Sequence, residues 1–489
     1  MADDDALNLD SRSYRNIGYD GRRVGRELFR DALAALRRRG HQRPVRRLSV
    51  LVDSCYQSDY LQGVMRTKPG MDAVLAAPAT QRLEELRVEL RAEFGPTYDV
   101  YVLPASRVPC RFLRVLELSG CTLGMPPPPP AAAFGLLETL EMRSCNSSPE
   151  DLQAMLDAAP SLARLWLQYM TFNPAERRVL LRCPGATASV TVIHCYGTDG
   201  LDVDAPGARS LRYTGFLEHF PFGSPAAPAP ATLQDVQLSF CTQRRCGRPP
   251  QSRETPPHAL FWGSIGGFSG LRALKLELLD INDIAIRSEE EEDAFLRVFP
   301  ELVFLELQGS YEVDAHGAAV AIANLLLCCP ALQEFHLDLK VHGDPYARHK
   351  RVLHQSDERK AQLGLEKYME SLKRLKSEKI VASPSSGVDD HDDGCDDADL
   401  DALRACSFPC LESHLRKIRL EFELKCFDCF EVRLAKFLVE NALVLEEMEV
   451  HDGNQRVCDH IHRNLPIWRA NSSKGKVKIV GDYPNGSNL

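Results

Sequence analysis

The chain has 489 residues, an apolar content of 44% and a formal net charge of −9 at pH 7. No apolar run approaches the roughly 20 residues that a membrane-spanning helix needs, and the start Met1-Ala2-Asp3-Asp4-Asp5 lacks the layout of a signal peptide. We therefore expect a cytoplasmic or nuclear protein without a membrane partner. Its 16 cysteines are expected to be reduced thiols that mostly fill the core.

Arginines crowd the N-terminal region between Arg22 and Arg47. Such a cluster can be a nuclear signal or a nucleic-acid patch, or it can be the solvent-exposed face of an amphipathic helix. Apolar residues alternate with the arginines at helical spacing, namely Leu28, Phe29, Ala32, Leu33 and Leu36. We expect a helix near Arg22 to Arg39 that ends at Gly40, and no nucleic-acid partner.

One apolar phrase, with anchors at the first, fourth and sixth positions, recurs along the chain. Its clearest copies begin at Leu113, Leu137, Leu162, Leu233, Leu271, Leu302, Leu332, Leu415 and Leu445, and weaker copies begin at Val45, Leu83 and Ala208. Each phrase predicts one short strand whose apolar side must be covered by its neighbours, which is typical of leucine-rich repeats. A single copy could equally be an ordinary amphipathic segment, but the series favours a repeat array.

The segments between the phrases predict returns to the next strand. The clearest is Pro149–Leu156, which begins behind a Ser148 cap with proline in the first turn and predicts a helix. Strands that alternate with such returns predict a parallel sheet. The expected fold is therefore α/β, an irregular leucine-rich-repeat solenoid with a curved parallel sheet and with helices or loops on its convex side.

Several segments interrupt this array. Pro126–Pro130 and Ser224–Pro230 are interpreted as stiff or low-complexity loops between repeats, and an adaptor ligand is the alternative for the first. Gly263–Gly270 is interpreted as a flexible entry to the next repeat. The largest interruption runs from about His342 to Asp401, where a charged helix is expected before a disordered acidic stretch.

Two groups near the C-terminal end are candidate metal sites. Asp389–Gly394 resembles a calcium loop, but Leu400 occupies the place of the bidentate glutamate that such a loop needs. Cys426 and Cys429 form the Cys-x-x-Cys pair, and with Cys406 and Cys410 they offer four thiolates to zinc. Phe427 and Phe430 beside the pair favour core packing.

We expect no catalytic, cofactor-binding or metal-binding residues, and hence no enzyme. The chain lacks the Gly-x-Ser-x-Gly elbow and the phosphate-binding loop. Cys458, His460 and His462 share one face of a short segment, yet a fourth ligand is missing nearby. A metal-dependent enzyme that uses these cysteines and histidines is the competing hypothesis.

The leading hypothesis is a protein partner held on the concave strand face. Residues between the anchors point to that face, because side chains alternate across a strand. The candidate partner-binding residues are Glu117, Arg164, Trp166, Gln168, Lys275, Phe304, Glu306, Glu334 and His336. Trp166 and Phe304 are the candidate anchors, with packing against a neighbouring repeat as the alternative.

Residues 408–418 (FPCLESHLRKI) and 434–448 (LAKFLVENALVLEEM) resemble the FBD-type C-terminal region of plant F-box/leucine-rich-repeat proteins. The arginine-rich helix with residues 45–50 (VRRLSV) looks like the segment that follows the F-box in this family. The resemblance implies recognition of substrates for a cullin-type ubiquitin ligase. The first forty residues contain no proline and no tryptophan, so no F-box is recognisable and a Skp-type adaptor is not expected to bind.

These features predict five regions. Residues 1–44 form an N-terminal arm and amphipathic helix, and residues 45–341 form the repeat array. Residues 342–404 hold the charged helix and acidic insert. Residues 405–470 form FBD-like repeats with a cap, in which Leu434, Phe437, Leu438, Ala442 and Leu445 face inward, and residues 471–489 form a flexible tail.

Overall fold

The computed structural model describes residues 5–17, 20–40, 43–54, 70–92, 101–104, 108–124, 133–172, 178–195, 200–222, 227–241, 255–311, 316–341, 400–423, 430–452 and 478–480. The chain divides into two compact units, unit 1 (Met1–Gln234) and unit 2 (Asp235–Leu489). Among the described residues, no helix is long and apolar enough to cross a membrane.

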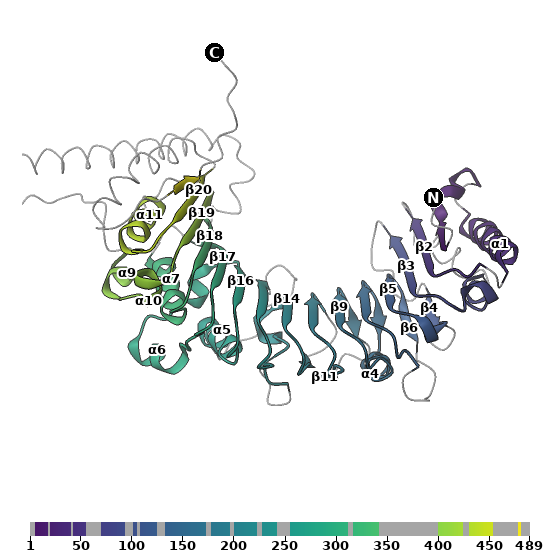
Figure 1. Cartoon of the computed structure of the whole chain (residues 1–489), viewed down its shortest axis with the longest axis horizontal. Coiled ribbons are helices and arrows are strands. Elements are labelled where there is room, and N and C mark those ends of the chain that lie inside the picture. The colour runs from purple at the N-terminus through teal and green to yellow at the C-terminus, as the bar shows by residue number, and fades with distance from the viewer. Residues whose placement is uncertain are drawn as a thin grey trace, which may run out of the picture. The chain divides into compact units, whose positions relative to one another are not determined.

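Unit 1 is built on a parallel sheet whose strands follow one another in chain order (Figure 1). The strands are β1 (Ala6–Asp10), β2 (Arg47–Ser54), β3 (Glu85–Ala92), β5 (Val115–Ser119), β7 (Thr139–Arg143), β9 (Arg164–Gln168), β12 (Ser189–Ile193) and β14 (Ser210–Phe216). Each pairs in register with the next, so that equivalent residues of successive repeats form rows across the sheet. The predicted parallel repeat fold is confirmed, and β1 extends the sheet into the predicted N-terminal arm.

The apolar phrase forms the core of unit 1. Leu162, Leu165 and Leu167 are fully buried beneath β9, and the anchors of the other phrases are buried in the same way. One repeat, β12, does not stand out in the leucine pattern, because its first anchor is Thr187 in place of leucine. The Thr187 hydroxyl donates a hydrogen bond of 2.8 Å to the Leu162 carbonyl, which allows a polar side chain to occupy the buried position.

Short strands and a few helices cover the apolar side of this sheet. A second sheet has the order β10 (Thr171–Phe172), β8 (Asn146–Ser147), β6 (Thr122–Gly124) and β4 (Val102–Pro104), and a third pairs β11 (Val179–Arg182) with β13 (Leu201–Asp204). The predicted helix is α4 (Pro149–Asp157), whose cap Ser148 accepts a hydrogen bond from the Asp151 amide. The repeats around it are short, so their returns form two- to four-residue strands where longer repeats have room for helices.

A ladder of backbone hydrogen bonds joins the turns that follow β5, β7, β9 and β12. The residues that begin these turns are Gly120, Ser144, Tyr169 and His194, all with positive φ (68°, 49°, 52° and 46°). Each donates its amide to the strand of the next repeat, at 2.8 to 2.9 Å. Left-handed backbone costs non-glycine residues free energy, so the ladder imposes strain at three of the four positions.

Cysteines follow three of these turn residues and are more than filler. The thiols of Cys121, Cys145 and Cys195 donate hydrogen bonds of 3.3 to 3.7 Å to backbone carbonyls. They occupy the Asn/Cys position of the leucine-rich repeat. Burial raises the pKa of the Cys145 thiol to about 11 and that of Cys195 to about 12, which keeps both protonated as donors.

The predicted arginine-rich helix is confirmed as α1 (Gly21–Arg39). Asp20 caps its start by accepting hydrogen bonds from two backbone amides, and Gly40 ends it at a φ of 56°. Leu28, Phe29, Ala32 and Leu36 are buried, whereas the arginines are mostly exposed. The apolar face packs on α3 (Gly70–Leu75), the 3₁₀ turns Ser11–Ile17 and Pro78–Thr80, and β1.

Unit 2 repeats the same plan, with helices where unit 1 has mostly short return strands (Figure 1). Its parallel sheet consists of β15 (Asp235–Cys241), β16 (Ala273–Leu278), β17 (Phe304–Tyr311), β18 (Glu334–Val341), β19 (Lys417–Glu423), β20 (Glu447–Asp452) and β21 (Lys478–Val480). The helices are α5 (Pro257–Ile265), α6 (Glu289–Phe295), α7 (His316–Cys328), α9 (Asp401–Ala405), α10 (Pro409–Ser413) and α11 (Phe430–Asn441).

Several details of unit 2 differ from the sequence-based expectation. Gly263 lies inside α5 and not in a flexible loop, because buried Phe261, Trp262 and Ile265 anchor that helix. Lys478–Val480 pairs with β20, within a segment that we predicted to be a flexible tail. A strand, a helix and a strand occupy residues 417–452, the order expected for this segment, with Leu434 and Leu438 fully buried. Pro126–Pro130 lies outside the described residues, as do residues 342–399, which hold the predicted charged helix, the acidic stretch and the calcium-like loop.

Candidate functional site

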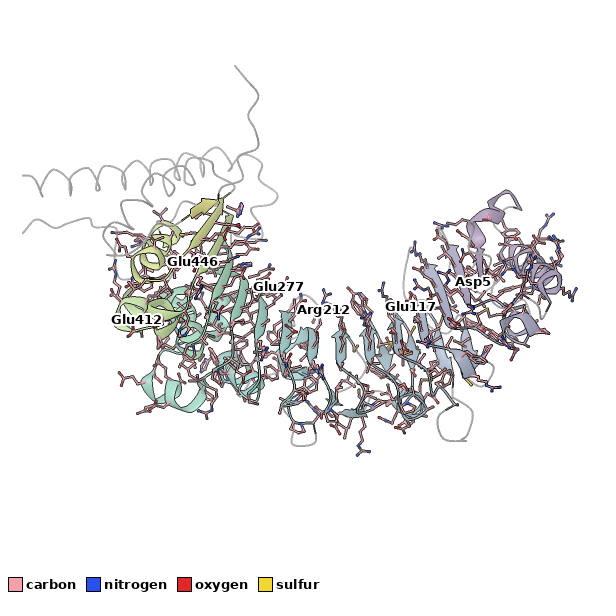
Figure 2. The ribbon with its side chains drawn as sticks, viewed as in Figure 1. Asp5, Glu117, Arg212, Glu277, Glu412 and Glu446 are labelled. Atoms are coloured by element: carbon pink, nitrogen blue, oxygen red, sulfur yellow. The ribbon has the colours of Figure 1, made fainter. Side chains whose placement is uncertain are left out.

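The side of each parallel sheet opposite the buried anchors carries polar and aromatic side chains, and we call it the open face. Figure 2 shows Glu117 and Arg212 on the open face of unit 1 and Glu277 on that of unit 2. Alternation along each strand produces this face: in β9, Leu165 and Leu167 are buried, while Arg164, Trp166 and Gln168 are exposed or half-buried. All nine candidate residues lie on the open face of their unit.

In unit 1, one row of side chains crosses the sheet through Trp166. Register places Arg87, Glu117, Glu141, Trp166, Thr191 and Arg212 at equivalent positions of β3, β5, β7, β9, β12 and β14. Arg87 forms an ion pair of 3.4 Å with Glu117, and Arg143 forms one with Glu141. The row therefore changes from paired charges over β3–β7 to aromatic and basic groups over β9–β14.

Two guanidinium groups hold the indole of Trp166 on this surface. Arg143 lies 5.5 Å and Arg212 5.8 Å from the ring centre. The indole Nε1–H donates a hydrogen bond of 3.2 Å to Gln168 Oε1. Arg212 reaches Trp166 across β12, where Thr191 is small enough to lie between them and is only 5% exposed. These contacts fix the ring in a half-buried position, as an interface anchor requires.

The carboxylates beside this group are close enough to influence each other. Glu117 and Glu141 lie at paired positions of β5 and β7. Partial burial raises the pKa of Glu117, and the Glu141 charge raises it further, while Arg87 opposes the shift. Arg87 and Arg143 therefore balance the negative charges of Glu117 and Glu141 on the open face of unit 1.

In unit 2, the structure brings all five candidate residues together on β16, β17 and β18. Lys275 Nζ donates to Glu306 Oε2 at 2.7 Å and lies 5.3 Å from the centre of the Phe304 ring. His336 packs edge-on against Phe304, with ring centres 5.0 Å apart, and its Nε2 lies 2.8 Å from Glu334 Oε1. Phe304 is half-buried by these neighbours.

Of the two alternatives for the candidate anchors, the structure shows the packing against neighbouring repeats. Trp166 and Phe304 each contact side chains of neighbouring repeats, yet both keep part of the ring at the surface. Glu141 and Arg212 lie in the same row as Trp166. They could have been predicted from the apolar phrase, because each stands between two anchors. Tyr169 and His194, whose rings stack at 5.5 Å, could not have been found, because only their left-handed backbone places them at the edge of the face.

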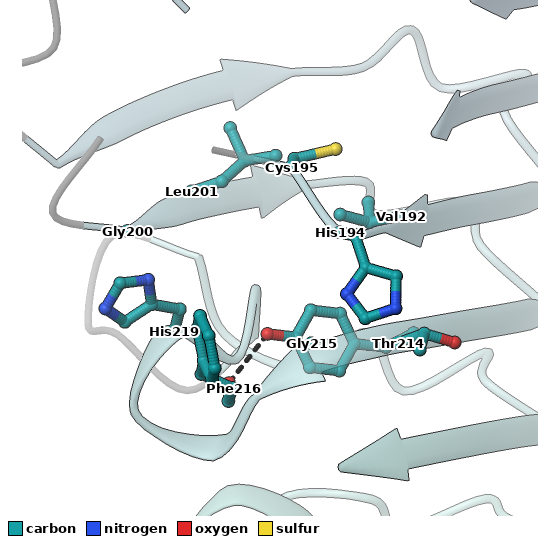
Figure 3. Close-up of a pocket in the computed structure, with 10 residues that line it drawn as sticks. Val192, His194, Cys195, Gly200, Leu201, Thr214, Gly215, Phe216 and His219 are labelled. Atoms are coloured by element: carbon teal, nitrogen blue, oxygen red, sulfur yellow. Dashed lines mark hydrogen bonds between the residues drawn. The ribbon is translucent and has the colours of Figure 1, made fainter. Parts of the chain in front are cut away.

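A small cavity lies at that edge of unit 1 (Figure 3), lined among others by His194, Cys195, Tyr213 and His219. The Tyr213 hydroxyl donates a hydrogen bond of 2.7 Å to the Phe216 carbonyl within it. Its volume of about 20 Å³ has room for one water molecule. It is far below the several hundred Å³ of a small-molecule site.

The candidate metal ligands are not assembled in the described part of the chain. There, no group of three or more histidine, cysteine or acidic side chains has the arrangement of a metal site. Cys410 is buried and donates to the Leu326 carbonyl at 3.7 Å, which is a packing role. Cys426, Cys429, Cys458, His460 and His462 lie outside the described residues.

The in-register parallel sheets, the buried leucine phrase and the helix or strand returns define an α/β leucine-rich-repeat solenoid. Such repeats commonly serve as protein-interaction modules. Residues 71–214 match the family model for the leucine-rich repeats of FBD-associated F-box protein At5g56370. This match supports a protein of the F-box/leucine-rich-repeat type. No curated protein matches the chain.

Proposed function

We propose that this chain is a non-enzymatic scaffold that binds a partner protein on the open faces of its repeat sheets. The observation that carries the proposal is the arrangement around Trp166 and Phe304. Each ring is held in place by charged side chains of neighbouring repeats, above anchors that are fully buried. A pre-positioned aromatic ring surrounded by charged groups is the usual centre of a protein interface.

We further propose that the partner is a substrate recognised in the manner of an F-box/leucine-rich-repeat ubiquitin-ligase adaptor. The match over residues 71–214 supports this reading, as does the strand, helix and strand arrangement of β19, α11 and β20 in the segment that resembles an FBD region. The alternative is a member of the same type that binds proteins without docking to a ligase. Binding to a Skp-type adaptor separates the two.

Capture of partners by the full-length protein tests the scaffold role. Immobilised wild-type protein is incubated with extract of its source tissue, and retained proteins are quantified by mass spectrometry. Trp166→Ala and Phe304→Ala each remove one anchor, while Glu290→Gln changes an exposed residue of α6 on the helical side. A partner of the open face should fall at least fivefold with one anchor variant and stay unchanged with Glu290→Gln.

The captured protein is then purified and titrated against the same variants. A direct affinity that falls with Trp166→Ala or Phe304→Ala supports the proposal. Partners that bind both anchor variants as tightly as the wild type, and are lost only with changes on the helical side, contradict it.

A further inference from the structure

The open face over β9, β12 and β14 carries positive charge, with no counter-charge at the described positions of these strands. Its nine outward positions, from Arg164 through Thr214, include no carboxylate. Arg164 and Arg212 are both exposed, and neither forms an ion pair within the described part of the chain. By contrast, Arg87 pairs with Glu117 on β5, and Arg91 pairs with Glu89 at 2.6 Å.

Aromatic side chains lie beside these two guanidinium groups. One of them, Tyr169, has a backbone conformation that its residue type disfavours. Tyr169 directly follows β9, is 45% exposed and has a φ of 52°. Glycine occupies the equivalent place after β5, at Gly120, and avoids the strain. The Tyr169 ring stacks almost parallel on His194, 5.5 Å away. Tyr169 thus keeps a large aromatic ring exposed at a ladder position where glycine would remove the strain.

We infer that this surface, which we call the Trp166 patch (Arg164, Trp166, Tyr169, His194 and Arg212), docks an extended acidic segment of the partner protein. The inference rests on the proposed function and specifies the chemistry of one interface. In the register Arg164 lies opposite Ser210, so Arg164 and Arg212 stand two strands and two residues apart, roughly 12 Å at the spacings of a sheet. Four residues of extended chain span about 13 Å and bring the side chains at positions i and i+4 to the same face, so carboxylates at these positions reach both guanidinium groups.

The intervening residues of such a segment lie over the indole. Trp166 presents a half-buried ring between Arg143 and Arg212, which offers contact area to small or apolar side chains. The two carboxylates of the segment thus pair with the arginines, and the residues between them pack on the Trp166 ring.

A protein segment fits this surface better than a nucleic acid. Glu141 lies directly beside Trp166 in the register of β7 and β9, and Glu117 follows on β5. These carboxylates repel a continuous phosphate backbone, whose binding needs many more cations than the two free arginines supply. On the open face of unit 2, outward carboxylates such as Glu277, Glu334 and Glu449 would repel the same acidic segment.

Fluorescence anisotropy with full-length protein tests the inference. The probe is a fluorescein-labelled peptide of three Asp-Ser-Leu-Ser repeats, which places carboxylates four residues apart on one face of an extended chain, with leucine between them on that face. The comparison probes are three Asn-Ser-Leu-Ser repeats and a twelve-nucleotide oligothymidylate. We expect the acidic peptide to bind at least tenfold more tightly than either, and its affinity to fall as salt rises.

Variants locate the binding. Arg212→Gln and Trp166→Ala should each weaken the acidic peptide at least fivefold. Tyr169→Gly should also weaken it, while the denaturation midpoint stays the same or rises, because glycine relieves the left-handed strain. Arg114→Gln is the matched control: this exposed arginine lies outside the patch, pairs with Glu138 and should leave the affinity within twofold.

Three outcomes overturn the inference: equal affinity for the neutral peptide, tighter binding of the oligothymidylate, or patch variants that bind like the wild type. The scaffold proposal fails separately. If captured partners depend on Phe304 while the acidic peptide does not bind, the open face remains a binding surface and only the Trp166 patch is excluded. If no partner depends on either anchor, both proposals fall.

Discussion

The ring of Phe29 in α1 packs against Gly70, the first residue of α3, so closely that a methyl group at position 70 would collide with it. Both residues are buried. We expect Gly70→Ala to lower the free energy of unfolding by about 1 to 3 kcal/mol, as overpacking of a core does. Gly263→Ala is the control, because a methyl group there meets nothing within 4 Å on an exposed part of α5. It should stabilise the protein by about 0.5 to 1 kcal/mol. Denaturant unfolding measures both, and a neutral Gly70→Ala would show that α1 can move away from α3.

The same packing predicts that α1 does not dock a Skp-type adaptor. Its apolar residues, including Leu28 and Leu36, are already buried against α3, β1 and the neighbouring turns. The remaining exposed face carries mainly arginines and is a poor match for an interface that must bury roughly 1,200 to 2,000 Å². Calorimetric titration of the full-length chain with the purified adaptor should show no submicromolar binding. Tight binding that disappears on deleting residues 1–40 would contradict this prediction.

Alternation along β17 predicts losses of stability of different size at neighbouring positions. Leu305 is fully buried, so Leu305→Ala should cost about 2 to 5 kcal/mol of unfolding free energy. Glu306 forms an ion pair with Lys275 on the open face, and Glu306→Ala should cost less than about 1 kcal/mol. Denaturant midpoints of the two variants give the comparison. A larger loss for Glu306→Ala would mean that the assigned phase of the strand is wrong.

The ladder of left-handed residues predicts a stabilising substitution. Ser144 is exposed and has a φ of 49°, so Ser144→Gly should raise the unfolding free energy by up to about 1 kcal/mol. Gly120, with a φ of 68°, is the complementary position, where alanine should destabilise the protein by about 1 to 2 kcal/mol. Thermal unfolding of the pair checks the sign, and a stabilising Gly120→Ala would refute the strain argument.

Thiol chemistry tests the cysteine positions. With a pKa of about 11, roughly one Cys145 thiol in a thousand is ionised at pH 8, so iodoacetamide should leave Cys121, Cys145 and Cys195 unmodified in the folded protein. Denatured protein is the control, and mass spectrometry should detect the label at all three of its positions. Rapid labelling of Cys145 in the folded protein would contradict its donor role.

The raised pKa of Cys145 makes the stability of the folded protein depend on pH. Because the folded-state pKa of Cys145 is raised above the ordinary value of 9.0, the thiol's contribution to stability is present below pH 9 and lost as pH rises toward 11. Cys145→Ala should therefore show a smaller loss of unfolding free energy between pH 9 and pH 11 than the wild type.

Periodicity made most of the fold predictable. Leucine at fixed offsets predicts buried anchors wherever apolar side chains alone fill the core, as at Leu113, Leu116 and Leu118. The pattern failed to predict a repeat where a polar side chain fills the buried anchor position, and it failed to predict strands that lack the full apolar phrase. Thr187 is buried through a hydrogen bond, and β1 and β21 are short edge strands whose pairing depends on a neighbour distant in sequence. Propensity and offset do not encode such long-range partners.

The candidate surface was predictable in part for the same reason. Residues between anchors, such as Trp166 and Lys275, point outward by alternation alone. The contacts that organise them are not local: Arg212 reaches Trp166 from two strands away, and Tyr169 reaches the surface through a backbone conformation that its residue type disfavours. Only the three-dimensional register brings these groups together.

The alternation that buries Leu165 and Leu167 on either side of Trp166 separates the residues that fold the strand from the residue that faces outward. A substitution at Trp166 alters the open face while the two leucines keep the strand folded. Under the proposed function, duplicated copies of such a chain can diverge toward new targets through single outward codons, without first acquiring compensating changes in the core.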